Sequence, residues 1–178
     1  MARALSWTDQ VHYWFFASHI PITLLMDSQA ILPPSLVPGS ISSLQRFYVE
    51  TFQDPLMANP PVWFKSMVTC ELLIQLPFFF WACRAIKNGA HQALNSIVWY
   101  HINLGDNSIR LPGLLYGAHV ATTLVPILGE FLFGFPAANL STTQRLALVA
   151  LYSPYLLVPI HYAWHLLRHP KPYGTHRD

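Results

Sequence analysis

The hydrophobic pattern of the chain consists of four long apolar segments separated by more polar connections. They cover about residues 8–26, 61–85, 114–133 and 145–167. Each is close to the roughly 20 residues that a helix needs to cross the hydrocarbon core of a bilayer. The pattern predicts an all-α membrane protein, a four-transmembrane-helix bundle, with residues 1–178 forming a single domain.

The connection between the first two segments predicts structure of its own. Pairs of residues containing proline punctuate it, and between them residues 40–52 have apolar side chains at helical spacing. These side chains are Ile41, Leu44, Tyr48 and Phe52. We therefore expect a short amphipathic helix that lies over the bundle as a lid.

Every apolar segment contains an internal proline. These prolines are Pro21, Pro77, Pro126, Pro154 and Pro159. A proline inside a helix removes one backbone donor and bends the helix. Bends in all four segments favour a bundle of proline-kinked helices that encloses a cavity, although a solid bundle remains the alternative.

Composition supports the membrane class and indicates an orientation. The chain is 53% hydrophobic and only 10% charged, whereas soluble domains have about 25% charged residues. A net charge of +2 gives no reason to expect a nucleic-acid partner. Seven lysines and arginines lie on the side of the termini and three on the other. The first group is Arg3, Arg84, Lys87, Arg110, Arg168, Lys171 and Arg177, and the second is Arg46, Lys65 and Arg145. Both termini are therefore expected in the cytosol, and the lid in the lumen.

Acidic side chains at the ends and inside these segments are the first candidates for a ligand site. His19, Thr23 and Asp27 share one face of the first helix. Asp27 either marks the water-facing end of that helix or receives a cationic or hydroxyl-bearing ligand. Asp54 precedes Pro55, so helix capping alone would explain it.

The second segment carries Glu71 and Gln75 four residues apart, surrounded by leucines and isoleucine. A buried carboxyl group must be neutral, paired or beside a wet cavity. It either lines a cavity or makes an interhelical hydrogen bond that fixes the packing.

The last two segments also have polar faces. Tyr116, His119 and Thr123 share one face of the third helix, as a cavity wall or as a polar packing seam. Tyr152 and Tyr155 bracket Pro154 and are either interfacial anchors or cavity wall.

Metal binding and nucleophilic catalysis have little support in the sequence. His161 and His165 have a spacing that can bind a metal, but two ligands are too few, and a solvated helix end is favoured. We expect no metal, no cofactor and no catalytic residue. Asn139 begins a glycosylation sequon on the expected lumenal side.

Several of these stretches together resemble the EXPERA family, in particular its sigma-2 receptor branch, which is related to the emopamil-binding sterol isomerase. The matching stretches include His19-Ile20-Pro21-Ile22-Thr23-Leu24, Asp54-Pro55-Leu56, Cys70-Glu71-Leu72 with Gln75-Leu76-Pro77, and Thr122-Thr123-Leu124 with Pro126. The resemblance implies a protein of the endoplasmic reticulum membrane, with other endomembranes such as the nuclear envelope or endolysosomes as further locations. It also implies binding of sterols, oxysterols and cationic amphiphilic molecules, contact with membrane lipid, a homodimer, and a role in cholesterol homeostasis beside a Niemann-Pick C-type sterol transporter.

The resemblance also implies roles for individual residues. Asp27 would pair with a ligand amine, and Asp54 would hydrogen-bond Asp27 and hold it. The expected pocket lining is Glu71, Gln75, Tyr116, His119, Thr123, Leu124, Tyr152 and Tyr155. The chain is thus interpreted as a binding protein rather than an enzyme.

Two departures from the family pattern bear on this interpretation. The chain has about fifteen additional residues within the range 92–110, which leave the start of the third helix open. Met67 stands where the sterol isomerase has a histidine, so the isomerase acid pair is not reproduced. The alternative remains a sterol or terpenoid isomerase or cyclase in which Glu71 or Asp27 protonates an alkene.

Overall fold

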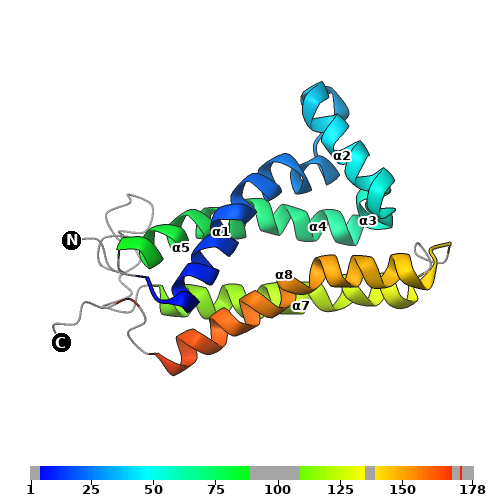
Figure 1. The fold of residues 1–178 in the computed structure, drawn as a ribbon. Coiled ribbons are helices and arrows are strands. Elements are labelled where there is room, and N and C mark those ends of the chain that lie inside the picture. The colour runs from blue at the N-terminus through cyan, green and yellow to red at the C-terminus, as the bar shows by residue number, and fades with distance from the viewer. Residues whose placement is uncertain (1–4, 89–108, 135–138, 170–172, 174–178) are drawn as a thin grey trace.

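The computed structural model describes residues 5–88, 109–134, 139–169 and 173 (Figure 1). Within these ranges the chain is helical and contains no strand. Among the described residues, three helices are long and apolar enough to cross a membrane, over Val62–Lys87, Arg110–Phe133 and Thr142–Arg168. The all-α class is therefore confirmed, and these three helices are candidate membrane spans.

The helices follow the apolar segments closely. In chain order they are α1 (Trp7–Leu25), η1 (Asp27–Ala30), η2 (Pro34–Leu36), α2 (Gly39–Phe52), α3 (Pro55–Ala58), α4 (Val62–Cys70), η3 (Glu71–Gln75), α5 (Leu76–Asn88), α7 (Arg110–Phe133) and α8 (Thr142–Arg168). The element η3 is a π-helical turn that joins α4 and α5. The predicted amphipathic stretch 40–52 lies in α2. Of the additional stretch 92–110, residues 92–108 lie outside the described residues, and α7 begins at Arg110.

Local sequence explains where the first and last helices begin. Ser6 accepts a hydrogen bond from the amide of Asp9, whose carboxylate accepts one from the amide of Ser6. Ser141 and Gln144 form the same reciprocal capping box at the start of α8. Such boxes satisfy amides that have no partner within the helix, and they fix the first turn.

Two pairs of helices form the body of the molecule. The helices α7 and α8 run antiparallel side by side, and α1 lies along α5 (Figure 1). Glycines allow α7 and α8 to approach closely. A Cβ atom on Gly117 would lie 2.7 Å from the Cβ of Ala163, and one on Gly113 would meet Leu166. Any larger residue at these positions would push the two helices apart.

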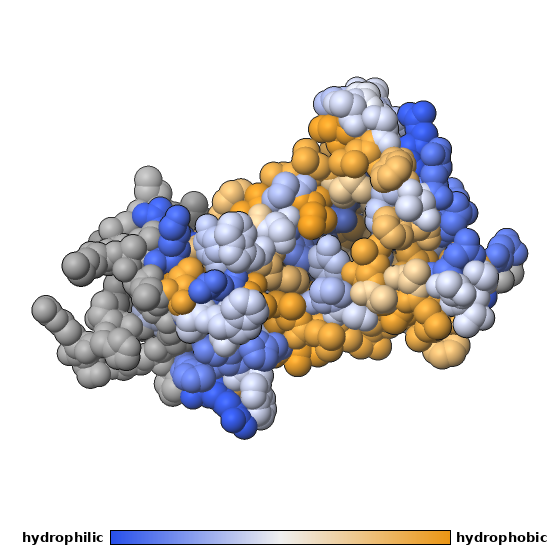
Figure 2. Space-filling view, in the orientation of Figure 1, coloured by the Kyte–Doolittle hydropathy of each residue, from blue (hydrophilic) through white to orange (hydrophobic). Residues whose placement is uncertain are grey.

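Two buried clusters fill the space between the pairs. One surrounds Phe16, Phe79 and Tyr162, near the start of α1. The other surrounds Leu56, Phe131 and Leu148, beneath α2 and α3. Apolar side chains also cover a broad band of the outer surface, while polar side chains gather at both ends (Figure 2). A lipid-embedded bundle has this distribution, because the bilayer replaces water around its middle.

Candidate ligand cavity

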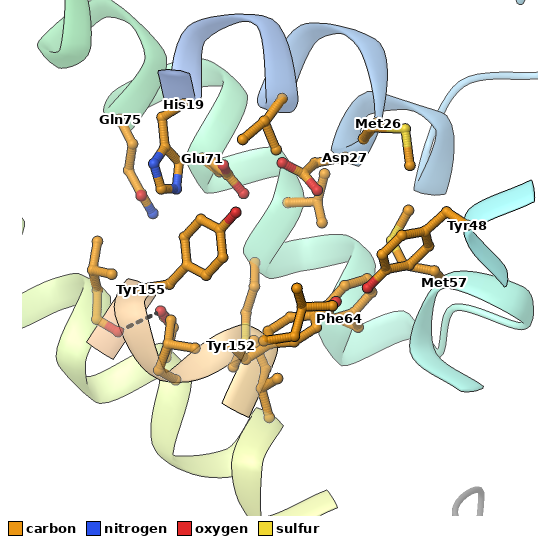
Figure 3. Close-up of a pocket in the computed structure, with 18 of the residues that line it drawn as sticks. His19, Met26, Asp27, Tyr48, Met57, Phe64, Glu71, Gln75, Tyr152 and Tyr155 are labelled. Carbon is orange, nitrogen blue, oxygen red and sulfur yellow. Dashed lines mark hydrogen bonds between the residues drawn. The ribbon is translucent and has the colours of Figure 1, made fainter. Parts of the chain in front are cut away.

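A cavity of about 280 Å³ lies between the two helix pairs, at the level where α1 ends (Figure 3). Its wall is mostly apolar and comes from eight elements. Its lining residues include Ile22, Met26, Met57, Phe64, Met67, Val68, Val120, Ile127 and Leu151, together with the polar residues described below. An apolar cavity with a few convergent polar groups is the usual form of a small-molecule site.

The structure brings most of the predicted site residues to this cavity. Eight of the ten line it, namely Asp27, Glu71, Gln75, Tyr116, Thr123, Leu124, Tyr152 and Tyr155. Asp54 and His119 do not line it. Asp54 is fully buried behind the wall, and the Nε2 atom of His119 is buried without a partner among the described residues. Whether the eight residues bind a ligand stays a prediction.

The π-helical turn places one of the carboxyl groups that line the cavity. Glu71 and Gln75 bound this turn, and both reach the cavity. π-helical turns occur mostly as single inserted turns, frequently at functional sites. The hydroxyl of Thr23 donates a hydrogen bond to Glu71 Oε1 at 2.6 Å, from the facing side of α1. Thr23 is fully buried, so this bond holds the Glu71 side chain in one position.

Asp54 has the capping role that its position before Pro55 predicts, and it also binds two tyrosine hydroxyls. Its Oδ1 atom accepts hydrogen bonds from the amides of Leu56 and Met57, at 2.9 and 3.2 Å. The predicted helix cap is thus confirmed. Its Oδ2 atom accepts from the hydroxyls of Tyr152 at 2.6 Å and Tyr48 at 2.9 Å. Four donors occupy the carboxylate.

The expected hydrogen bond from Asp54 to Asp27 is consequently not formed between these two residues. Instead, Asp54 joins α3 to α2 and α8 through the two tyrosine hydroxyls. Burial, and next the charge of Asp54, raise the pKa of Tyr48, so its hydroxyl stays a donor.

Asp27 begins η1, directly after α1, and points into the cavity from the same side as Glu71 (Figure 3). Burial, the charge of Glu71 and then that of Asp54 raise the pKa of Asp27 well above its usual range. Neighbouring carboxyl groups in an apolar space cannot both ionise cheaply. A cation placed between them would remove that difficulty, and so would one proton held by the pair.

His19 also lines the cavity, although it was not among the predicted site residues. Its Nδ1 atom lies 3.3 Å from the carbonyl oxygen of Phe15. With Nδ1 donating to that carbonyl, Nε2 remains as an acceptor. Its ring meets that of Tyr155 edge to face, with 4.6 Å between the centroids. The sequence signal that could have added His19 to the predicted site residues was the polar face of the first helix.

The histidines near the end of α8 lie away from this cavity. His12 of α1 is fully buried, and its Nε2 atom lies 3.0 Å from Nδ1 of His161. The end of α8 is therefore only partly solvated. Within the described part of the chain, no three histidine, cysteine or acidic side chains are placed to hold a metal ion.

Comparison with known proteins identifies the family. The model of the EXPERA family, the expanded EBP superfamily, matches residues 40–166. The chain belongs to the EXPERA family. Within this family it is 47% identical to the sigma intracellular receptor 2 of Xenopus tropicalis over 164 residues, which are 89% of this chain and 85% of the relative.

Two further relatives extend the range of the comparison. The human sigma intracellular receptor 2 is 43% identical over 164 residues, covering 88% of this chain and 85% of the relative. The efficient mitochondria targeting-associated protein 19 of Saccharomyces cerevisiae is 27% identical over 158 residues, covering 85% and 92%. The chain is thus a homologue of the sigma-2 receptors along most of its length, and that membership supports the role of a membrane binding protein.

Proposed function

We propose that this chain is a receptor of the endoplasmic reticulum membrane that binds cationic amphiphilic molecules and sterols or oxysterols in the cavity. The observation that carries the proposal is the pair of carboxyl groups, Asp27 and Glu71, in a mostly apolar cavity. A protonated amine would ionise Asp27 and form a charge-assisted hydrogen bond with it. The apolar wall would receive the rest of an amphiphile, and also a neutral sterol.

In this proposal α1 is a fourth membrane-spanning helix, and α2 is a lumenal lid over the cavity. The prolines bend the spans around the cavity, and both termini are cytosolic. The similarity to sigma intracellular receptor 2 supports a role in sterol homeostasis or transport. We extend the proposal to a homodimer and to a Niemann-Pick C-type sterol transporter as partner, which co-purification from membranes would test.

Competition binding on Asp27→Asn tests the ligand class. Tertiary-amine binding should weaken about tenfold or more, because a hydrogen bond to a charged group contributes roughly 1.5–3 kcal/mol. Binding of a neutral sterol should change little, since asparagine keeps the shape of the side chain. Unchanged amine affinity would refute the ion pair.

The second candidate function is an isomerase or cyclase acting on a sterol or terpenoid. The same two carboxyl groups favour it, because a protonated and an ionised carboxyl side by side can donate and accept a proton. Met67 argues against it, since this position lines the cavity without an ionisable group. Turnover of sterols and terpenoids by the purified protein, with Glu71→Gln as control, separates the two functions.

A further inference from the structure

A second concave site lies on the outer surface, between α7 and α8. This groove has a volume of about 420 Å³ and an almost entirely apolar lining. The lining residues are Leu114, Gly117, Ala118 and Ala121 from α7 and Ile160, Ala163, Trp164 and Leu167 from α8. None of them lines the cavity, so the two sites use different faces of the helices.

The groove follows from the close contact of the two helices. A Cβ atom on Gly117 would lie 2.8 Å from the carbonyl oxygen of Pro159, so the helices cannot move closer there. Ala118 and Ala121 leave the floor shallow, while Trp164 and Leu167 form a wall and are 53% and 52% exposed. The groove is therefore a fixed feature of the packing between α7 and α8.

Two arginines stand at the end of the groove where α7 begins and α8 ends. Arg110 lies one helical turn before Leu114, on the same side of α7, and its Nε atom donates to the Leu166 carbonyl oxygen at 3.0 Å. The guanidinium of Arg168 lies 4.4 Å above the ring of Trp164. A cationic end on an apolar trough matches an anionic head group on an acyl chain.

We propose that this groove binds one anionic phospholipid. An acyl chain lies along the floor over Ala118 and Ala121, and the phosphate meets Arg168 and Arg110 at the end. A sterol has no charge to match two guanidinium groups. A helix from a second copy would fill the trough but would leave Arg168 unmatched.

Native mass spectrometry tests the proposal on full-length protein released from vesicles of phosphatidylcholine containing about one tenth phosphatidylserine. We expect one retained phosphatidylserine, preferred over phosphatidylcholine. The Arg168→Gln variant should retain about tenfold less, because a charge-assisted pair contributes roughly that factor. The double variant Ala118→Leu with Ala121→Leu fills the trough and should lose the lipid.

Two matched variants control for charge and bulk. Lys87→Gln removes an exposed cation from the corresponding end of α5, and Ala150→Leu enlarges an exposed alanine of α8 outside the groove. Both should retain phosphatidylserine like the parent chain. Equal retention of the two lipids, or retention that survives both groove variants, would overturn the proposal. The proposal would also be overturned if the Ala118→Leu, Ala121→Leu variant changed from a dimer to a monomer while its lipid content stayed the same.

Discussion

At the scale of single residues, Asp54 connects more of the molecule than any capping role requires. It caps α3 and accepts hydrogen bonds from Tyr48 of α2 and Tyr152 of α8. Tyr152 also lines the cavity, so the position of the wall depends on a carboxylate that lies behind it. Asp54 is thus a positioning residue for the cavity, whereas Asp27 itself lines the cavity.

Replacing Asp54 by asparagine should therefore weaken amine and sterol binding together. It should also lower the free energy of unfolding by at least about 1 kcal/mol, the usual contribution of a helix cap. Ser141→Ala removes the cap of α8 far from the cavity and should cost similar stability without affecting binding. Thermal unfolding and competition binding measure both effects. Loss of amine binding alone would instead assign Asp54 to the ligand site.

The Thr23–Glu71 hydrogen bond leads to a prediction about ligand preference. Thr23→Val keeps the volume but removes the donor, so Glu71 should become mobile and the preference between amine and sterol should change by about fivefold, given roughly 1 kcal/mol per hydrogen bond. Thr122→Val, at an exposed position of α7, is the matched control. Identical affinities in the parent and Thr23→Val would show that the bond only fixes packing.

The raised pKa of Asp27 predicts a pH dependence of amine binding. The ionised carboxylate is the form that pairs with an amine, so affinity should fall as the pH is lowered through the raised pKa of Asp27. Without ligand the sign is opposite. Ionisation of a group with a raised pKa costs folding free energy, so stability should decrease as the pH rises through that pKa. Asp27→Asn should flatten both profiles, measured by binding and by thermal unfolding between about pH 5 and 9.

At the scale of elements, α2 is fastened at several points over the end of the cavity. Tyr48 bonds to Asp54, Gln45 donates to the carbonyl of Met57, and Gln29 of η1 donates to the carbonyl of Ile41. Its exposed side carries Leu44 and Phe47, while Tyr48 faces the cavity. A ligand that leaves past α2 would have to break these bonds.

Tyr48→Phe should accordingly speed ligand dissociation more than it weakens equilibrium binding. Loss of one hydrogen bond of roughly 1 kcal/mol predicts an increase of about fivefold in the dissociation rate. Ser43→Ala removes an exposed hydroxyl of α2 that donates to the carbonyl of Ser40 within the same helix, and it should leave the rate unchanged. An unchanged rate for Tyr48→Phe would mean that the exit route does not pass α2.

At the scale of the whole molecule, the sequence predicts the helices better than the contacts between them. Apolar runs of sufficient length indicate helices in lipid, and a four-residue spacing places Glu71 beside Gln75. The pairing of Thr23 with Glu71, and of Asp54 with Tyr152, joins residues 48 and 98 positions apart. Periodicity within one helix carries no information on such pairs. Similarly, apolar wall residues such as Val120 and Ile127 look like ordinary membrane-helix residues in the sequence.

The orientation of the bundle gives the last prediction. The excess of lysine and arginine near the termini predicts that both lie in the cytosol, which requires α1 to cross the membrane as well as the three longer helices. A glycosylation tag in the η2–α2 connection should be modified in microsomes, and a tag after Asp178 should not. Asn139→Gln removes the natural sequon, so that any glycosylation observed is on the tags. A glycosylated C-terminal tag beside a modified η2–α2 tag would mean an even number of crossings between them, instead of the three expected. The two-carboxyl cavity would then still exist, but α2 could not be the lumenal lid of a four-span bundle with cytosolic ends.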